Sequence, residues 1–474
     1  MINDSLRWLL LATPIVLVIY YPLPRRLQNI WLLIACYTFY ALWQWQQAVI
    51  LLILTTVNFG LGLLLAHFEG RPRRLLLSLG VALNIFSLVF LKYDLLNKGL
   101  ALIQHGTGTP ADTLGLIIPL GLSFTVLQTI SYLVDIANNR IPASSSPVDF
   151  ALYLAYFPKV IAGPIERAKN LLPQFESTRI VDDERLIRST IRIGVGLFRK
   201  VLIGNLLLEL IPADAFTQPS NFGSLNLFLY LIIYGFGLYN DFAGYTAIAR
   251  GISGLFGIDL SPNFNLPYFA SSFTEFWNRW HMSFSFWLRD YIYFPLSRNL
   301  AKIVPNRKNM IHVIIPPLVT MILSGLWHGA SWNMVLWGAI HGVFLMIRRI
   351  PLPGQGSFPP NQRARPYMVV GGILTFMFVI LAWIPFRMAL PEAGKYFRAM
   401  LNPGFIISQP MPMIAILIVM IALMLDMIEL RSGEFASLQW PWPARTVALS
   451  FVIVLIFVVY LGVGPTSTFV YQDF

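Results

Sequence analysis

Long apolar stretches, each free of charged residues and separated by short charged segments, dominate the chain. Strands of a membrane barrel would alternate in polarity over about ten residues, whereas these runs stay apolar over twice that length. Because a spanning helix needs about 20 residues, the pattern predicts an all-α integral membrane protein with roughly ten to twelve crossings. The uncharged stretches are 27–68, 75–91, 113–134, 215–240, 309–347, 366–386, 399–425 and 446–472.

The first apolar run, from Trp8 to Tyr21, lacks the small-residue cleavage site of a secretory signal, so we expect it to remain as the first span. The two long gaps between the predicted spans, 135–224 and 241–310, hold apolar and amphipathic segments rather than a polar soluble domain. We therefore expect one polytopic membrane domain over residues 1–474. Further spans are predicted near 27–43, 48–66, 75–91, 115–134, 225–240, 311–326, 334–347, 367–385, 412–428 and 446–463.

Two segments between the predicted spans are neither clean spans nor polar loops. Residues 150–165 are too short to cross alone and are interrupted by Pro158 and Gly163. Because irregular backbone at membrane depth is tolerated only against protein, we expect a buried re-entrant or surface segment there. Residues 185–208 carry basic side chains, including Arg199 and its neighbour, at helical spacing. That pattern is typical of a helix lying along the cytoplasmic interface.

A third segment, residues 273–295, places five aromatic side chains at offsets that fall on one face of a helix. The charged residues lie beside that face. Composition alone favours an amphipathic interfacial helix anchored by Trp and Tyr. The five aromatic residues are Trp277, Trp280, Phe284, Trp287 and Tyr291.

Composition agrees with the membrane assignment and narrows the choice of partners. Only 12% of the residues are charged, against about 25% in soluble domains. The net charge of +12 comes from basic residues in short loops, which report membrane topology rather than nucleic-acid binding. An uncharged turn at 44–47 separates two predicted spans, so Arg25 and Arg71 should both be cytoplasmic, as should Arg348, with the N-terminus outside. Cys36 is the only cysteine, which excludes an internal disulfide.

Two histidines lie where a polar side chain is costly. His328 and His341 both lie in the uncharged stretch 309–347, and ionisable groups within spans tend to mark function. Thirteen residues place them on different faces of an unbroken helix, so they can meet only if the chain reverses near 329–333. A neutral imidazole bonded to a neighbouring helix is the plain structural alternative.

The types of chemistry open to these histidines are limited. Neither HExxH spacing nor nearby Cys, Asp or Glu ligands are present, so we expect no metal site. No G-x-S-x-G elbow, P-loop or dinucleotide fingerprint occurs. A histidine without a protein nucleophile beside it fits general-base activation of a bound hydroxyl. From the residues alone, a histidine-lined proton or solute pathway fits equally well.

Several motifs resemble the membrane-bound O-acyltransferase (MBOAT) family. Its hallmark is a histidine within a long hydrophobic stretch, as in SGLWHGASWNMVLWGAIHG at 324–342. The other matching strings resemble the bacterial branch, which contains the membrane subunit of alginate O-acetylation and the teichoic-acid D-alanylation protein. The resemblance covers about 120–390. The other strings are IPLGLSFTVLQTISYLVD, FPKVIAGPIERAKNLLPQF, YNDFAGYTAIARGI, NFNLPYFASSFTEFWNRWHMSFSFWLRDYIYFPL and AWIPFRM.

The resemblance implies which residues carry the reaction. The near-invariant histidine of the family corresponds to His328, and its second conserved polar position corresponds to His281. His328 would then be the base when an acceptor hydroxyl attacks a thioester, with His281 orienting or sharing the proton. His341 matches a further histidine of less certain role. Supporting or tunnel-lining residues would be Trp277, Trp280, Trp327, Asn333, Pro158 and Gly163.

The resemblance also implies partners and location. We expect a multi-pass protein of the bacterial inner (plasma) membrane, no bound cofactor, and an acyl thioester such as acetyl-CoA as donor. The acceptor would be an extracytoplasmic polysaccharide, or a partner protein that passes the acyl group onward, and nucleic acid is not expected. FAGYT at 242–246 leans towards the D-alanylation type, whereas WHGASWN and GPIER favour the alginate type. A transporter or channel without acyl chemistry, and a scaffold for polymer export, are the rival functions.

Overall fold

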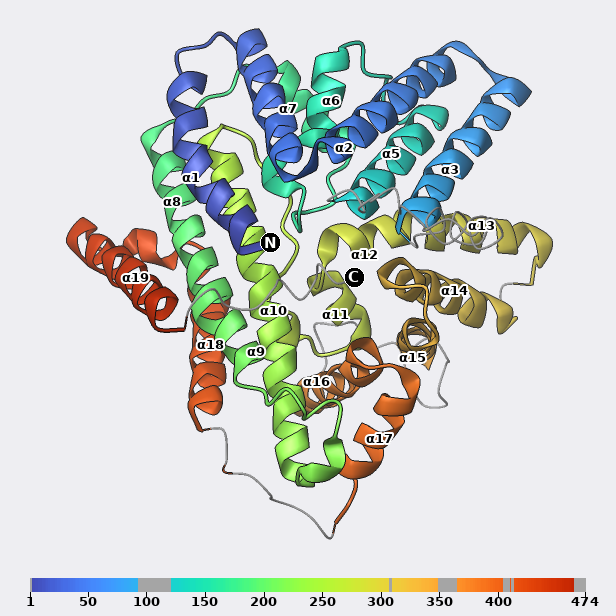
Figure 1. Ribbon diagram of the computed structural model, residues 1–474. Coiled ribbons are helices and arrows are strands. Elements are labelled where there is room, and N and C mark those ends of the chain that lie inside the picture. The colour runs from blue at the N-terminus through green and yellow to red at the C-terminus, as the bar shows by residue number, and fades with distance from the viewer. Residues whose placement is uncertain are drawn as a thin grey trace, which may run out of the picture. The chain divides into compact units, whose positions relative to one another are not determined.

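The computed structural model describes residues 2–92, 121–306, 309–347, 365–403, 410 and 413–463 (Figure 1). Over these residues every regular element is a helix, which confirms the all-α prediction. Six helices are long and apolar enough to cross a membrane, and three further apolar helices are shorter. The protein is therefore a multi-pass membrane protein, while a total of ten to twelve crossings stays a prediction.

The chain divides into two compact units. The first unit comprises Met1–Thr190 with Ala249–Ser261, and the second comprises Ile191–Ile248 with Pro262–Phe474. Helices α8 (Asp183–Leu197) and α10 (Ser224–Leu255) each contribute to both units.

The first unit contains most of the predicted N-terminal spans. Helix α2 has a break at Gln44, where the backbone is extended, so the turn predicted between two spans is present. Asn84 of α3 exchanges hydrogen bonds with Asn58 of α2 and accepts one from Thr129 of α5. Such polar contacts join helices where lipid supplies no hydrophobic drive. The helices are α1 (Ile2–Tyr20), α2 (Arg25–His67), α3 (Gly70–Lys92), α5 (Leu122–Ala137), α6 (Pro147–Ala155), η1 (Phe157–Lys159) and α7 (Ala168–Glu176).

The segment predicted to be re-entrant is irregular and buried. Every residue from 149 to 166 is buried, which confirms that it packs against protein. Gly163 lies against the backbone of Lys159, where an added Cβ would be only 2.3 Å from the Cα atom. Lys159 itself donates to Gln128 Oε1 at 2.6 Å, and burial lowers the pKa of its amine to about 7. No pattern in the sequence indicated that this amine is buried.

The second unit contains the remaining helices. They are η2 (Phe198–Asn205), α9 (Leu206–Glu209), η3 (Pro219–Asn221), η4 (Pro267–Phe269), α11 (Phe273–Arg279), α12 (Met282–Leu288), η5 (Arg289–Tyr293), α13 (Phe294–Ile303), α14 (Ile311–His328), α15 (Trp332–Ile347), α16 (Arg365–Arg387), α17 (Leu390–Met400), α18 (Met413–Ser432), η7 (Ala436–Gln439) and α19 (Trp442–Val463).

The basic pair in 185–208 is buried, which differs from the exposure expected of an interfacial helix, whereas the interfacial position of α8 stays a prediction. Arg199 and its neighbour Lys200 are 5% and 4% exposed. Arg199 donates to Asp426 at 2.6 Å and to Glu429 at 3.0 Å, and Lys200 pairs with Asp241. Burying these cations is possible because carboxylates from α18 and α10 compensate their charge. Helical spacing alone could not reveal those partners, which are distant in sequence.

The aromatic segment 273–295 also differs from its prediction. A single amphipathic helix is wrong, because the chain breaks into α11, α12 and the π-helix η5, with His281 between the first two in a left-handed conformation at φ 42°. Trp277, Trp280 and Phe284 are at most 8% exposed, so they are core residues and not surface anchors. The break at His281 changes the direction of the second half of the segment. Helical periodicity could not predict this break.

Helices α14 and α15 form a close antiparallel hairpin (Figure 1). Glycines allow the two backbones to touch: a Cβ added to Gly338 would lie 2.2 Å from the carbonyl oxygen of Met321, and one on Gly325 would lie 2.0 Å from that of Met334. Small residues at helix contacts are typical of membrane proteins. The hairpin holds the two candidate histidines His328 and His341.

Candidate active site

His328 lies on α14 and His341 lies on α15, where the two helices of the hairpin face each other. His328 is the last residue of α14, and the chain reverses through 329–331 before α15 begins at Trp332. Trp337 packs edge-on against both imidazoles, with ring centroids 5.4 Å from His328 and 4.8 Å from His341. The reversal that the sequence required for these histidines to meet is therefore present. Both are buried, at 4% and 2% exposure.

His281 approaches the same cluster from the break between α11 and α12. Asn263 fixes the turn, because its carbonyl accepts from Met282 N at 2.8 Å and its side chain accepts from Ser283 Oγ at 2.5 Å. The imidazole packs edge-on against Phe242, with ring centroids 4.9 Å apart, and in a tilted arrangement against Phe284, with centroids 5.2 Å apart.

The ring of Phe284 joins His281 to His328. Its centroid is 5.2 Å from that of His281 and 5.8 Å from that of His328. Burial lowers the pKa of His281 to about 3, because an apolar setting disfavours the charged form. The imidazole is thus neutral at physiological pH, the form that can accept a proton.

The other predicted residues of this unit lie around the histidines. Trp327 contacts His328 at 4.9 Å, and Trp277 contacts His341 at 5.1 Å. Trp280 packs on Trp383 at 5.2 Å. Asn333 donates to the carbonyl of Pro385, at 3.0 Å, and so ties the start of α15 to α16.

Two predicted residues, Pro158 and Gly163, belong to the first compact unit. They lie in its fully buried segment. Their role in lining a tunnel stays a prediction.

Two residues of the cluster were missed by the sequence analysis. Trp337 is 1% exposed and contacts His328 and His341. Phe386, from α16, packs on His328 at 5.3 Å and on Trp337 at 5.2 Å. The signal for Trp337 was its position one helical turn before His341, whereas Phe386 is too distant in sequence for spacing to place it.

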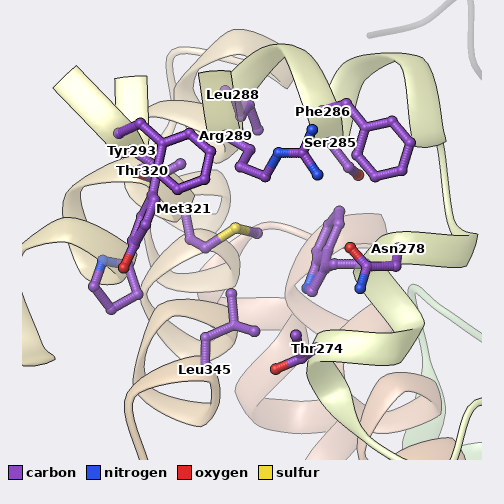
Figure 2. Close-up of a pocket in the computed structure, with 13 residues that line it drawn as sticks. Thr274, Asn278, Ser285, Phe286, Leu288, Arg289, Tyr293, Thr320, Met321 and Leu345 are labelled. Atoms are coloured by element: carbon purple, nitrogen blue, oxygen red, sulfur yellow. The ribbon is translucent and has the colours of Figure 1, made fainter. Parts of the chain in front are cut away.

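A pocket of about 180 Å³ opens beside this cluster (Figure 2). Helices α11, α12, η5, α13, α14 and α15 supply its walls, with Met321 and Leu345 facing Arg289 and Ser285 across it. Trp277 is part of the lining. Among the described residues no group of three or more His, Cys, Asp or Glu side chains could hold a metal ion.

Comparison with known proteins places this arrangement in a family. The sequence model of the membrane-bound O-acyltransferase family matches residues 137–386, a range that includes His281, His328 and His341. The probable alginate O-acetylase AlgI of Pseudomonas aeruginosa is 34% identical over 413 residues, covering 85% of this chain and 75% of that protein.

Two further relatives are named for different activities. The peptidoglycan O-acetyltransferase of Helicobacter pylori is 30% identical over 406 residues, covering 79% of this chain and 74% of that protein. The teichoic acid D-alanyltransferase of Streptococcus thermophilus is 31% identical over 287 residues, covering 56% and 68%. With more than half of its length matched by the family model, the chain belongs to the membrane-bound O-acyltransferase family and is an acyltransferase.

Proposed function

We propose that this acyltransferase O-acetylates a cell-surface or secreted polysaccharide, with His328 as the general base. The observation that carries the proposal is the position of His328: buried at the end of a span, between Trp337 and Phe386, and joined to the neutral His281 through Phe284. The neutral imidazole is the form that can take a proton from a bound hydroxyl.

The reaction follows from that position. The acceptor oxygen attacks the thioester carbonyl while His328 takes its proton. Collapse of the tetrahedral intermediate breaks the C–S bond, and the proton passes from the imidazole to the departing thiolate. The products are an O-acetyl ester and a free thiol, and no acyl-enzyme intermediate forms. His281 shares or orients the proton.

The polysaccharide acceptor is supported by the relatives with the widest coverage. Those relatives are named for alginate and peptidoglycan O-acetylation, and they align with 79% or more of this chain. Acetyl-CoA in the cytoplasm is the proposed donor, and an extracytoplasmic protein that relays the acetyl group is a proposed partner. The protein would lie in the bacterial inner membrane as one membrane domain.

The proposed topology places the N-terminus outside and Arg25 and Arg71 in the cytoplasm. Arg348, which should share their side, lies outside the described residues. Cysteine-accessibility labelling in a Cys36→Ala background measures the sidedness of both described positions. Labelling of Arg25→Cys and Arg71→Cys from opposite faces would contradict the two-span assignment for 27–66.

Transfer of labelled acetyl tests the function directly. Purified protein in lipid bilayers, with and without its operon partners, receives [acetyl-¹⁴C]acetyl-CoA and candidate polysaccharides. Label in an alkali-labile ester on the polymer, lost in His328→Ala, is the expected result. A protein that transfers D-alanine from a carrier-protein thioester but no acetyl would instead perform the reaction named for the D-alanyltransferase relatives.

A further inference from the structure

The apolar pocket beside the histidine cluster is larger than an acetyl group requires. Its volume is about 180 Å³, and Phe286, Leu288, Met321 and Leu345 supply apolar walls. An apolar cavity of about 150 Å³ accepts benzene. The pocket could therefore hold a chain of roughly six carbons, whereas the methyl of an acetyl group would leave it almost empty.

Trp277 both lines the pocket and contacts the histidine cluster. The pocket lining includes Trp277, and the same indole packs edge-on against Trp337 at 5.9 Å and against His341 at 5.1 Å. Trp337 in turn contacts His328. The indole thus forms a wall between the pocket and the histidines.

Packing alone holds this wall in place. Trp277 is 8% exposed, and its buried indole N–H has no hydrogen-bond acceptor among the described residues. A smaller side chain would therefore open the wall without leaving a buried acceptor unpaired.

The pocket is also bounded by two irregular helical segments. Arg289 and Tyr293 belong to the π-helix η5, and Pro317 lies inside α14. Single π-helical turns are frequent at functional sites. Helix irregularity at a pocket next to the cluster supports a role in binding.

We propose that Trp277 sets the length of the acyl group that this enzyme transfers. The indole excludes acyl chains from the pocket and restricts the donor to acetyl, and a small residue at this position lets a chain of four to six carbons extend from the thioester carbonyl into the pocket. This inference rests on the proposed acetyl transfer.

The test compares chain-length profiles of the wild type, Trp277→Ala and Trp277→Phe. Each protein in lipid bilayers receives acetyl-, butyryl- and hexanoyl-CoA with the polysaccharide acceptor. A methylene in an apolar pocket changes selectivity by about 10-fold or more, so the hexanoyl-to-acetyl ratio of kcat/KM should rise at least ~10-fold in Trp277→Ala, with Trp277→Phe between. Trp442→Ala is the matched control, because it removes the same side chain from an exposed position that is not part of the pocket lining. Its profile should match the wild type.

Binding of non-transferable acyl-CoA thioethers separates the two proposals. Absence of acetyl transfer by the wild-type protein would contradict the proposed function. Binding of the thioethers requires no acceptor, so it tests the role of Trp277 independently. Tighter binding of the hexanoyl thioether by Trp277→Ala alone supports the inference. Identical chain-length dependence in the wild type and a well-folded Trp277→Ala or Trp277→Phe, or a bilayer lipid retained in the pocket after purification, would overturn it.

Discussion

His341 and His328 share one neighbour, Trp337, whose ring lies 4.8 Å from the first imidazole and 5.4 Å from the second. Through this ring a change at His341 reaches His328. His341 also touches Trp277. It is therefore placed to position the proposed base rather than to replace it.

Replacing His341 should give a partial defect. We expect His341→Ala to lower turnover by roughly 10-fold, less than loss of the general base would, because typical general acid–base contributions are 10²–10⁴-fold. His341→Phe, which restores a ring against Trp337, should recover part of the loss. Steady-state acetyl transfer measures both variants. Loss as large as that of His328→Ala, unrescued by Phe, would assign chemistry to His341.

The buried neutral state of His281 predicts a dependence of stability on pH. Its pKa is lowered to about 3 in the folded protein and is about 6.5 in the unfolded chain. Because the unfolded chain binds the proton first, the contribution is present above pH 6.5 and is lost as the pH falls towards 3. Between pH 7 and pH 5 the loss is roughly 2 kcal/mol.

Thermal unfolding in detergent at pH 7 and pH 5 checks this expectation. His281→Asn, which keeps a polar side chain but does not titrate there, is the control. Its unfolding temperature should fall less than that of the wild type on acidification. Equal acid sensitivity in the two proteins would contradict the low pKa.

The Arg199–Asp426 pair should hold α18 against η2. Leaving one member of a buried ion pair alone typically costs 3–5 kcal/mol, about the loss expected for Arg199→Met. The double variant Arg199→Met/Asp426→Leu should recover part of that loss, because no unpaired carboxylate remains at Asp426. Unfolding free energies of the four proteins in a double-mutant cycle give the coupling. Additive losses would show that the two side chains do not interact.

The hairpin glycines predict a steric effect on the site. Gly338→Ala would press a Cβ against the Met321 carbonyl, and overpacking costs about 1–3 kcal/mol. Acetyl transfer should fall together with stability, because the close approach of α14 and α15 at Gly338 positions His328 and His341. Gly394→Ala is the control, since nothing lies within 4 Å of its Cβ and the helix there should gain about 0.4–1 kcal/mol. Similar behaviour of the two variants in thermal unfolding would contradict the close approach.

Periodicity and hydropathy predicted most of the helices, because a long apolar run in a membrane has few alternatives to a helix. The turn at Gln44, the burial of 149–166 and the reversal before Trp332 were also within reach, since polar or Gly/Pro residues interrupt the apolar pattern there.

The aromatic segment shows where such prediction fails. Its residues fit one helical face, yet Asn263 stabilises a break at His281 through bonds that no local pattern contains. The pairing of Arg199 with Asp426 likewise joins positions 227 residues apart. Both features depend on contacts between segments that are distant in the chain, and a single sequence does not show such contacts. His328 was singled out by its uncharged surroundings and by resemblance, and His281 by resemblance alone, whereas their shared contact with Phe284 required the structure.

Acetyl transfer by His328→Asn, beside His328→Ala, measures the role of the proposed base most directly. Asn keeps a polar, hydrogen-bonding side chain at the end of α14 but cannot take a proton from the acceptor hydroxyl. The general-base role predicts that a folded His328→Asn protein still binds acetyl-CoA and loses about 10²–10⁴-fold in turnover, as His328→Ala does. Turnover close to the wild type in a well-folded His328→Asn protein would contradict it.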